Sequence, residues 1–386
     1  MGKYNAKSFD ADIAILGLGS MGSFAFWQTA KSKQKVIGFE QYKPGHSQGA
    51  GHGETRIFRT AYGEGVEYVP LLQEARTLWK ELEDETQVEL YTENGGIMFG
   101  PENDSFMENV GKSVHVYNLP HKTWNGKEAR KAYPQIQFKD NQTAIYEELA
   151  GYIRPELAIE TAVKRGEELG GKIYAETPVT AIDADSAGVT VSTAMRQFRV
   201  KKLIVSAGGW TNSLLPQLNL PLELERQVLV WYDAKNPELF TPEKFPIFSR
   251  VVDGVGFYGF PSLDGKTVKV AIHRGDSDII HHPSEVDREI RDKDLEVVTK
   301  LVKEYLPGLE PEPVKAKTCF YTNTPDEHFV IGEAPGLSNV ILLGPMAGHG
   351  FKFAPVIGKI GANLALGKTS GLAIDIFNPG RFINKI

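Results

Sequence analysis

The stretch ADIAILGLGSMGSFAFWQTAKSKQKVIGFE, residues 11–40, decides the fold. An apolar run with the character of a β-strand leads into glycines, and a helix-like segment and a second apolar run follow within about 30 residues, as in a βαβ unit. Gly17, Gly19 and Gly22 have the spacing G-x-G-x-x-G. Such glycines allow a tight turn, close approach of backbone to a pyrophosphate, and close packing of helix on strand. The second run ends at Glu40, where a carboxylate can accept hydrogen bonds from ribose hydroxyls, so the stretch predicts a dinucleotide-binding loop.

A second glycine turn bears on which dinucleotide is bound. Residues 203–210, LIVSAGGW, read as a strand that ends in glycines before a helix, and Gly208 lies in that turn. Flavoproteins commonly bring such a turn back to the nucleotide, whereas simple nicotinamide dehydrogenases lack it. The stretch therefore favours FAD, and NAD binding or an ordinary strand–helix turn are the alternatives.

The bulk composition narrows the function classes. A chain of 386 residues exceeds the size at which one core usually stops growing, so we expect two domains. The net charge of −6 disfavours nucleic acid as a partner. No run approaches the ~20 apolar residues of a membrane helix, and no leader peptide is apparent. We expect a cytoplasmic protein, a monomer, with no nucleic-acid or membrane partner. We also expect no metal, because no zinc-spaced cluster occurs, and neither a P-loop nor a GxSxG elbow is found.

The expected fold class is α/β (α+β), a Rossmann-like FAD-binding domain plus an antiparallel-sheet substrate domain with helices. Segments such as VLVWYDA and VGFYGFPS alternate in polarity, which predicts an antiparallel sheet with one solvated face. We assign residues 1–89, 151–216 and 319–386 to the discontinuous FAD-binding domain, and residues 90–150 and 217–318 to the substrate-binding domain.

The chain contains one cysteine, Cys319, in the stretch KAKTCFYTNTPDEHFVIG. A single cysteine excludes an intramolecular disulfide. The thiol can be an inert small hydrophobe, a nucleophile or an attachment point, and composition alone favours the first.

Five stretches in a fixed order carry a family resemblance: GHGETRIFRTAYGEGVEYVPL (residues 51–71), FYGFPS, KVAIH, the cysteine with YTNTPDEHF, and GHGFKFAPVIG. With the glycine loop they span residue 11 to about residue 360. In these motifs the chain resembles the monomeric sarcosine oxidase and N-methyltryptophan oxidase family of flavoproteins. The resemblance implies an FAD cofactor and a small secondary amine with O2 as substrates.

The resemblance also implies roles for individual residues. The ADP-binding loop would be Gly17, Gly19, Gly22 and Glu40, and further cofactor contacts would come from Gly208, Gly348, Gly350 and Lys352. The flavin ring would be lined by His52, Thr55 and Arg56. Cys319 would carry the flavin covalently, through a thioether to its 8α-methyl group, and proximity to cationic groups would favour that reaction.

On the substrate side, Arg59 and Lys352 match the pair that holds the substrate carboxylate, which suits the planar fork of arginine and the point charge of lysine. Tyr258 matches an aromatic at the substrate site and His273 a neighbouring histidine. Lys269 matches the lysine that promotes reaction with oxygen. We therefore take Lys269, Arg56, His273 and Tyr258 as the catalytic candidates. The structural alternatives are a solvated strand face for Lys269, a core position for Tyr258, and surface salt bridges for Arg59 and Lys352.

Some positions depart from the family pattern. Gly51 and Thr60 stand where relatives commonly have histidines, and Pro345-Met346-Ala347 replaces a more usual Gly-Phe-Ser. We expect these positions to border the cavity and to alter which amine side chain fits. His349 is flanked by glycines, which we attribute to close approach of backbone to the flavin.

The expected reaction is the oxidation of an N–CH bond of a secondary, N-methyl amino acid such as sarcosine or N-methyltryptophan. The flavin takes a hydride equivalent, the imine is hydrolysed to an aldehyde and an amino acid, and O2 becomes H2O2. The alternatives are an oxidase of another secondary amine (a glycated amino acid, pipecolate or a cyclic imino acid), a flavin dehydrogenase with another acceptor, an NAD-dependent dehydrogenase, and a non-catalytic flavin-binding protein.

Overall fold

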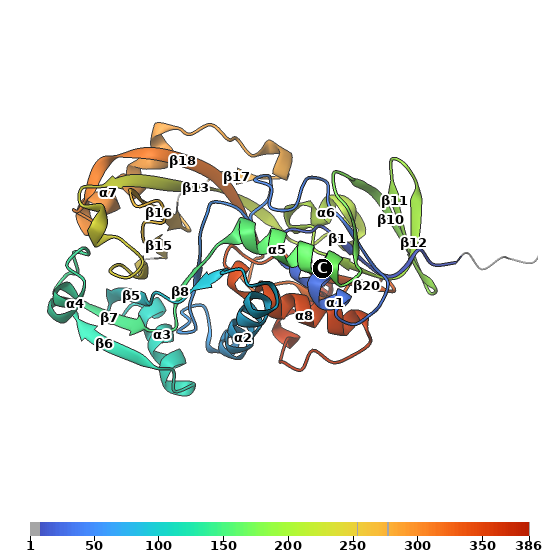
Figure 1. Cartoon of the computed structure of the whole chain (residues 1–386), viewed down its shortest axis with the longest axis horizontal. Helices are drawn as coiled ribbons and strands as arrows, with labels where there is room; N and C mark the ends of the chain where they lie inside the picture. The colour runs from blue at the N-terminus through green and yellow to red at the C-terminus, as the bar shows by residue number, and fades with distance from the viewer. Residues whose placement is uncertain (1–7, 253, 276–277, 386) are drawn as a thin grey trace, which may run out of the picture.

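The computed structural model describes residues 8–252, 254–275 and 278–385, and shows two parts side by side (Figure 1). The predicted domain ends at residues 1 and 386 lie outside the described residues, and the division into domains stays a prediction. None of the helices in these three ranges is long and apolar enough to cross a membrane.

The first part is built on a sheet whose centre is parallel, as the glycine-rich stretch predicts. β1 pairs in parallel with β12 on one side and with β2 on the other, and β20 extends the sheet in parallel beyond β12. The strands are β10 (Val179–Asp185), β11 (Gly188–Thr193), β12 (Gln197–Val205), β1 (Ala11–Leu16), β2 (Val36–Phe39) and β9 (Lys172–Tyr174), with β20 (Val340–Leu343) paired to β12 and β19 (Ile331–Glu333) paired to β20.

Both faces of β1 are buried, which explains why its sequence is a continuous apolar run. Ile13 and Ile15 pack on one face into a cluster with the helices. Ala14 and Leu16 pack on the other face against residues of β11 and β12. Successive side chains of a strand alternate between its faces, so one short run contributes to two cores.

Helices cover the first part, and α1 packs between α5 and α8 (Figure 1). The helices of the chain are α1 (Ser20–Ala30), α2 (Val69–Thr86), α3 (Ser105–Val116), α4 (Gly126–Ala132), α5 (Pro155–Glu168), α6 (Thr211–Leu214), α7 (Asp292–Tyr305) and α8 (Ala354–Ala365). Short 3-10 helices are η1 (Val66–Tyr68), η2 (Gly208–Trp210), η3 (Pro216–Leu218), η4 (Pro237–Leu239), η5 (Pro283–Glu285), η6 (Phe351–Phe353), η7 (Asp375–Phe377) and η8 (Pro379–Lys385).

The second part contains a larger, mainly antiparallel sheet in which only the pairing of β14 with β5 is parallel among the described pairs. Its strands are β17 (Ile279–Ile280), β13 (Glu223–Ala234), β16 (Thr267–His273), β15 (Val255–Gly259), β14 (Ile247–Val252), β5 (Gly96–Pro101), β7 (Gln142–Glu147) and β6 (His121–Asn125), with β18 (Leu309–Asn323) paired to β13. A small third sheet contains β3 (Arg56–Phe58), β8 (Gly151–Ile153) and β4 (Tyr91–Thr92).

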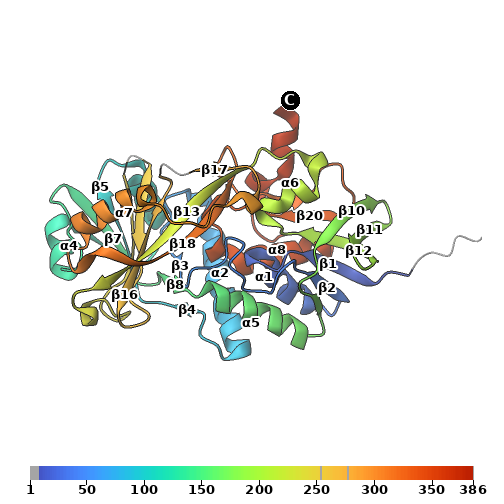
Figure 2. The ribbon, with the colours of Figure 1, turned by 90° about the horizontal axis from the view of Figure 1, so that it is seen from above.

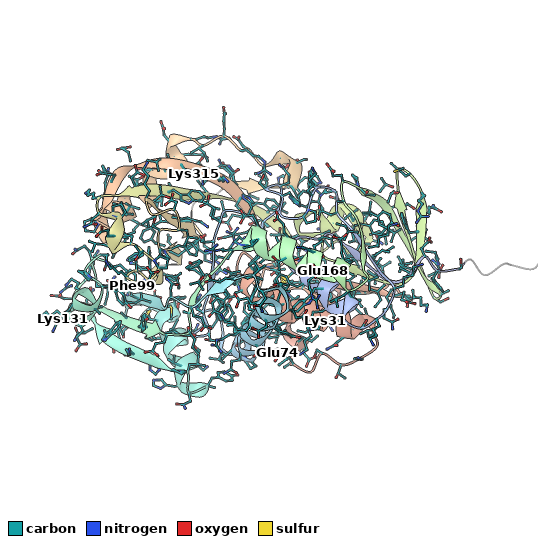
Figure 3. All side chains as sticks on the ribbon, viewed as in Figure 1. Lys31, Glu74, Phe99, Lys131, Glu168 and Lys315 are labelled. Carbon is teal, nitrogen blue, oxygen red and sulfur yellow. The ribbon has the colours of Figure 1, made fainter. Side chains whose placement is uncertain are left out.

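One face of the larger sheet packs against α7 and α4. Phe99, Val268 and Val270 lie in that core, while Lys131 on α4 is exposed and points outward at the far end of the molecule (Figure 3). The alternation seen in the sequence thus gives one apolar face.

The prediction that the opposite face is solvated is wrong. Trp231, Ala271 and Cys319 form a buried cluster on that face, and Lys269 is also buried there. The face turns toward the first part rather than toward water, because β13 and β18 reach across to it (Figure 2). β18 continues to Asn323, so the predicted domain boundary at residue 319 falls inside a strand.

Candidate active site

A cavity of about 360 Å³ lies where the two parts meet. Its lining includes Gly17, Gly19 and Glu40 of the glycine-rich stretch and also Arg59 and Lys352. The structure therefore brings the candidate nucleotide loop and the candidate carboxylate pair into one cavity, of the size usual for ligand sites.

Close packing explains two of the three loop glycines. A Cβ atom at Gly22 would lie 1.7 Å from the carbonyl oxygen of Gly17. A Cβ atom at Gly17, where φ is +84°, would lie 2.7 Å from the carbonyl oxygen of Ser206. No side chain fits at either position, so the turn can pass tightly between α1 and the loop that follows β12.

Other glycines leave a cradle open toward the cavity. A Cβ atom at Gly19 or Gly208 would meet no protein atom within 4 Å, and both residues line the cavity. α1 begins at Ser20 with no acidic residue in its first turn, so its N-terminus offers positive potential to an anion. These features fit the pyrophosphate of a dinucleotide.

Glu40 lines the same end of the cavity as an ionised carboxylate. It accepts hydrogen bonds from the backbone N–H groups of Leu18, at 2.8 Å, and Tyr42, at 3.0 Å, and lies 3.4 Å from Nε2 of His46. Burial alone would raise the pKa of Glu40, but these partners lower it. A charged acceptor at this place suits ribose hydroxyls.

At the other end, Arg59 forms a two-pronged contact within the protein. Its Nη2 donates to both carboxylate oxygens of Glu64, at 2.8 Å each, and its Nη1 donates to the carbonyl oxygen of Ala61 at 3.0 Å. Arg59 is only 4% exposed. Nη2 alone contacts both oxygens of Glu64, so the pair is charge-assisted, and Glu64 occupies the nitrogen that any other carboxylate in the cavity would need.

Lys352 lies close to Arg59. Its Nζ donates to the carbonyl oxygen of His349 at 2.8 Å, and both cations lie over the ring of Tyr62, Arg59 at 4.7 Å and Lys352 at 5.2 Å from its centre. The Tyr62 hydroxyl and Nδ1 of His349 are 2.6 Å apart. One aromatic ring therefore holds the two cations that the sequence predicts as a pair.

The charges of this end depend on burial. Burial lowers the pKa of Lys352 to about 7, and the nearby Arg59 acts in the same direction. Burial opposes ionisation of Glu64, but the charge of Arg59 lowers its pKa well below the usual range. Burial also lowers the pKa of His349 to about 3, so this imidazole is neutral.

Tyr258 and His273 line the cavity on neighbouring strands, β15 and β16. Nδ1 of His273 lies 3.2 Å from the hydroxyl of Tyr321, a further lining residue on β18. Burial, with the charge of Arg274, lowers the pKa of His273 to about 3. A neutral imidazole and a tyrosine thus line this side of the cavity.

Lys269 is held just behind the cavity lining. Its Nζ donates to the carbonyl oxygens of Gly53, at 2.6 Å, and Thr55, at 2.9 Å, and to Oγ1 of Thr55 at 3.1 Å. Burial, and then the charge of Arg56, lower the pKa of Lys269 well below its usual value. The ammonium also lies 4.7 Å from the centre of the Phe260 ring.

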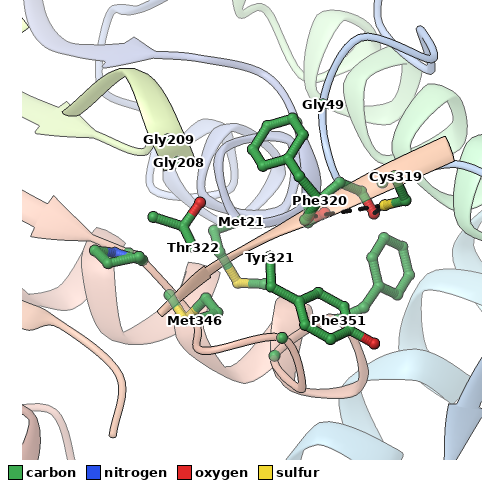
Figure 4. A pocket seen from close by; sticks show the side chains of 18 of the residues that line it. Met21, Gly49, Gly208, Gly209, Cys319, Phe320, Tyr321, Thr322, Met346 and Phe351 are labelled. Atoms are coloured by element: carbon green, nitrogen blue, oxygen red, sulfur yellow. Dashed lines mark hydrogen bonds between the residues drawn. The ribbon is translucent and has the colours of Figure 1, made fainter. Parts of the chain in front are cut away.

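Cys319 lines the cavity on β18, with Tyr321 on the same strand and Gly208 opposite (Figure 4). The thiol is buried, and its Sγ lies 3.9 Å from Nη2 of Arg56 and 3.9 Å from the carbonyl oxygen of Ala50. Arg56 thus places a cationic group beside the thiol at the cavity wall.

The structure brings most of the predicted site residues together. Those that line the cavity are Gly17, Gly19, Glu40, Arg56, Arg59, Gly208, Tyr258, His273, Cys319, Gly348, Gly350 and Lys352. His52 and Thr55 lie behind it as chain neighbours of the lining residues Gly51 and Arg56. Neither ring nitrogen of His52 has a hydrogen-bond partner in the described part of the chain, and burial lowers its pKa to about 3.

The departures from the family pattern divide into two groups. Gly51, Pro345 and Met346 line the cavity, as expected. Thr60 does not, because its backbone N–H and hydroxyl both bond to the buried carboxylate of Glu147. Ala347 is not among the lining residues either, and its N–H donates to the carbonyl oxygen of Thr322 at 3.1 Å.

Sequence reasoning missed Glu64, Tyr62, Tyr321 and Glu147. Glu64 and Tyr62 lie within the motif around Arg59, and Tyr321 follows Cys319 by two residues, so they share a strand face. These short distances in sequence from Arg59 and Cys319 could have identified the three residues as neighbours of the site. Glu147 had no such signal, because it lies far from Thr60 in the chain. Among the described residues, the structure assembles no cluster of His, Cys, Asp or Glu that could hold a metal.

Comparison with known proteins decides between the two dinucleotides. A profile of the family of FAD dependent oxidoreductases matches residues 12–364. Monomeric sarcosine oxidase of Streptomyces avermitilis is 35% identical over 375 residues, which is 96% of this chain and 97% of that protein. N-methyl-L-tryptophan oxidase of Citrobacter koseri is 35% identical over 373 residues, 96% of this chain and 99% of that protein.

Solved structures agree on the fold. NikD, an amino acid oxidase essential for nikkomycin biosynthesis, superposes with a TM-score of 0.84 at 21% identity, covering 96% of this chain and 97% of that one. L-proline dehydrogenase from P. horikoshii gives a TM-score of 0.83 at 20% identity, over 97% and 98% of the two chains. At these identities the likeness supports the fold only.

Proposed function

Because the chain belongs to the family of FAD dependent oxidoreductases, and within it to the group of monomeric sarcosine oxidase and N-methyl-L-tryptophan oxidase, we propose that it oxidises a secondary, N-methyl amino acid. The observation that carries this proposal is the cation pair: Arg59 and Lys352 meet over the Tyr62 ring in the same cavity as the glycine loop and Cys319.

The cavity residues fit FAD. The open cradle at Gly19 and Gly208 would take the pyrophosphate, Glu40 the ribose, and the space beside Arg56 and Cys319 the flavin ring. FAD supplies the chemistry of accepting a hydride equivalent from a CH–N bond and passing two electrons to O2. The protein binds and orients the amine and sets the charges around it.

Arg59 and Lys352 would bind the carboxylate of the amino acid. For this, the carboxylate takes the place of Glu64 on Nη2 of Arg59, where Glu64 now contacts at 2.8 Å. The positive charges disfavour an ammonium on the same ligand, so the amine binds more readily in its neutral form, the form that can be oxidised. His273, whose pKa burial lowers to about 3, stays neutral and can hydrogen-bond to the neutral amine without adding a further positive charge.

The atoms of the overall reaction balance as follows. One N-methyl amino acid, one O2 and one water give the free amino acid, formaldehyde and H2O2. The C–H bond of the methyl group breaks, the imine carbon gains the water oxygen, and the C–N bond is then cleaved. Arg56 and Lys269 would stabilise the negative charge that develops near the flavin and on oxygen.

An amine panel tests the function. N-methyl amino acids, a glycated amino acid, pipecolate and proline are supplied to the purified protein while peroxide is measured. The proposal is supported if N-methyl amino acids give peroxide with the highest kcat/KM of the panel. A higher kcat/KM for pipecolate or for a glycated amino acid would identify that amine as the substrate instead. Turnover with an artificial acceptor and no peroxide from any amine would make the protein a flavin dehydrogenase instead.

Cys319 is proposed as the covalent attachment point of the flavin. After acid precipitation, the wild type should keep its yellow colour in the pellet, and Cys319→Ala should release it into the supernatant. The intact mass of the wild type should exceed that of the chain by one FAD. Equal release from both proteins would return Cys319 to a packing role.

We also propose that the enzyme works as a monomer in the cytoplasm. A lone thiol suits a reducing compartment. Sedimentation of the holoenzyme at micromolar concentration, with a single species of 42.7 kDa plus FAD, is the expected result.

A further inference from the structure

The three oxygen atoms that bind Lys269 belong to one short loop. Gly53 and Thr55 supply the two carbonyls and the hydroxyl, and Arg56, the next residue, lines the cavity. The position of the ammonium therefore depends on what holds residues 53–55 in place.

The conformation of this loop is not one that its residues adopt readily. Gly53 has a φ of +99° and Glu54 a φ of +72°. A residue with a side chain is uncommon in this left-handed region, so Glu54 needs support from outside the loop. A Cβ atom at Gly53 would lie 2.3 Å from Leu229, which leaves the loop little room to relax toward β13.

That support comes from the carboxylate of Glu156. Its Oε1 accepts from the backbone N–H of Gly53 at 2.6 Å, and both its oxygens lie 3.2 Å from the N–H of Glu54. Two successive N–H groups that converge on one anion form a nest. The peptide unit between Gly53 and Glu54 therefore contacts both charged groups: its N–H points at Glu156 and its carbonyl oxygen accepts from Lys269.

Glu156 is well placed for this contact. It is in the first turn of α5, where a carboxylate is favoured by the helix dipole, and Pro155 fixes the start of the helix. The loop has a second anchor in the side chain of Glu54, which accepts from Nε1 of Trp231 at 3.0 Å and pairs with Lys315. That second anchor holds the Glu54 side chain and leaves the N–H groups to Glu156.

We propose that Glu156 is the positioning residue of Lys269: its carboxylate holds the loop whose carbonyls aim the ammonium at the site where O2 reacts. This inference rests on the proposed function. Glu156 touches neither the cavity nor the ammonium and acts through residues 53–55. Its negative charge also favours the protonated form of Lys269. The titratable and charged groups around that ammonium are Arg56, Glu54, His52, Cys319 and Glu156.

The main experiment separates the two halves of the reaction. In Glu156→Gln, the shape of the side chain remains but the charge is lost and one acceptor becomes a donor. The holoenzyme is reduced with dithionite and mixed with O2, so this measurement needs no amine. We expect reoxidation to slow about 10-fold, while anaerobic reduction by the amine changes less than about 2-fold. The fall of the reoxidation rate with rising pH should begin at a lower pH, because removing the anion lowers the pKa of Lys269.

A second measurement does not depend on activity. Hydrogen–deuterium exchange of the peptide covering residues 52–56 should speed up in Glu156→Gln, and exchange in β12 should not change. Glu167→Gln is the matched control, because Glu167 is an exposed residue of the same helix. Glu156→Asp, which keeps the charge on a shorter arm, should recover part of the reoxidation rate.

Two results would overturn the proposal. One is an unchanged reoxidation rate with unchanged exchange in residues 52–56. The other is an equal fall of both half-reactions, which would make Glu156 a general structural residue. Failure of the proposed function is recognised separately, as an absence of reduction by any amine in the wild type while the chemically reduced wild type still reacts with O2.

Discussion

The two ends of the cavity are built in opposite ways. The nucleotide end comes largely from one contiguous stretch, residues 11–40. Its glycines have no side chain, which leaves room for close packing of the backbone and for a ligand. The amine end is assembled from the segment after β3, from β15 and β16, and from η6, and works through buried charges. The nucleotide end thus depends on glycines, which have no Cβ atom, and the amine end depends on buried charged side chains that contact one another.

Because of this difference, substitutions at the two ends of the cavity should have different consequences. A change at the nucleotide end acts on backbone packing, and therefore on folding and cofactor binding together. A change at the amine end alters a balance among Arg59, Glu64 and Lys352, and therefore acts on the affinity for a carboxylate while the fold and the flavin remain.

The largest effect is expected for Gly22→Ala. The added Cβ would lie 1.7 Å from the carbonyl oxygen of Gly17, so α1 must move away from the turn. We expect a loss of about 3 kcal/mol in the free energy of unfolding and a protein purified without FAD. Denaturant unfolding and the flavin absorbance of the purified protein measure the two effects.

Gly19→Ala is the matched control at the same loop. Its Cβ would meet no protein atom within 4 Å, so the free energy of unfolding without FAD should be unchanged, while FAD binds more weakly. If Gly19→Ala destabilised the protein without FAD as much as Gly22→Ala does, the distinction between packing and cradle glycines would be wrong.

Arg59→Gln should give the next largest effect, at the other end. Losing a forked, charge-assisted contact to the substrate carboxylate should lower kcat/KM by ~10²-fold, with the FAD content unchanged. Steady-state kinetics and the absorbance ratio of flavin to protein test this. Arg59→Lys keeps the charge but not the planar guanidinium, so its kcat/KM should lie between those of the wild type and Arg59→Gln. A wild-type kcat/KM in Arg59→Gln would show that Arg59 does not bind the substrate.

Glu64→Gln should act in the opposite direction. It removes the anion that occupies Nη2 of Arg59 at 2.8 Å, so a carboxylate ligand should bind about 3–10-fold more tightly. Titration of the holoenzyme with propionate, followed by flavin absorbance, gives the Kd. Weaker binding in this variant would mean that Glu64 helps to hold the ligand rather than competing with it.

The smallest effect expected is a pH dependence of carboxylate binding. Burial, with the charge of Arg59, lowers the pKa of Lys352 to about 7, so its ammonium is lost as the pH rises through that value. Propionate should therefore bind a few-fold more weakly above about pH 7 than below it. Lys352→Arg stays charged and should show a flat profile over the same range, and a flat profile in the wild type would contradict the assignment.

Local patterns were enough for much of the fold. Residues 11–40 predicted β1, α1 and β2, and residues 203–210 correctly predicted a strand that ends in glycines before a helix, which is the end of β12 with η2 and α6. The alternation in VLVWYDA and VGFYGFPS correctly predicted strands of an antiparallel sheet, β13 and β15. These features depend on spacing within one segment, which a sequence displays directly.

The partners of the buried charges were not predictable in the same way. Thr60 was expected at the cavity, but Glu147 on β7 binds its hydroxyl and backbone. Lys269 lies on a face that the pattern predicts as solvated, and only the packing of β13 and β18 against the first part buries it. Polarity alternation reports which residues share a face but not what covers that face.

The sequence by itself therefore determined where glycines allow backbone to approach backbone and ligand, and which charged side chains are available. The tertiary structure alone decided the pairing of those charges: Arg59 with Glu64 and Lys352, and Lys269 with the loop held by Glu156. The physical reason is distance. Steric exclusion by a Cβ atom acts within one turn of chain, whereas the state of a buried charge depends on every group that folding brings within a few ångströms of it.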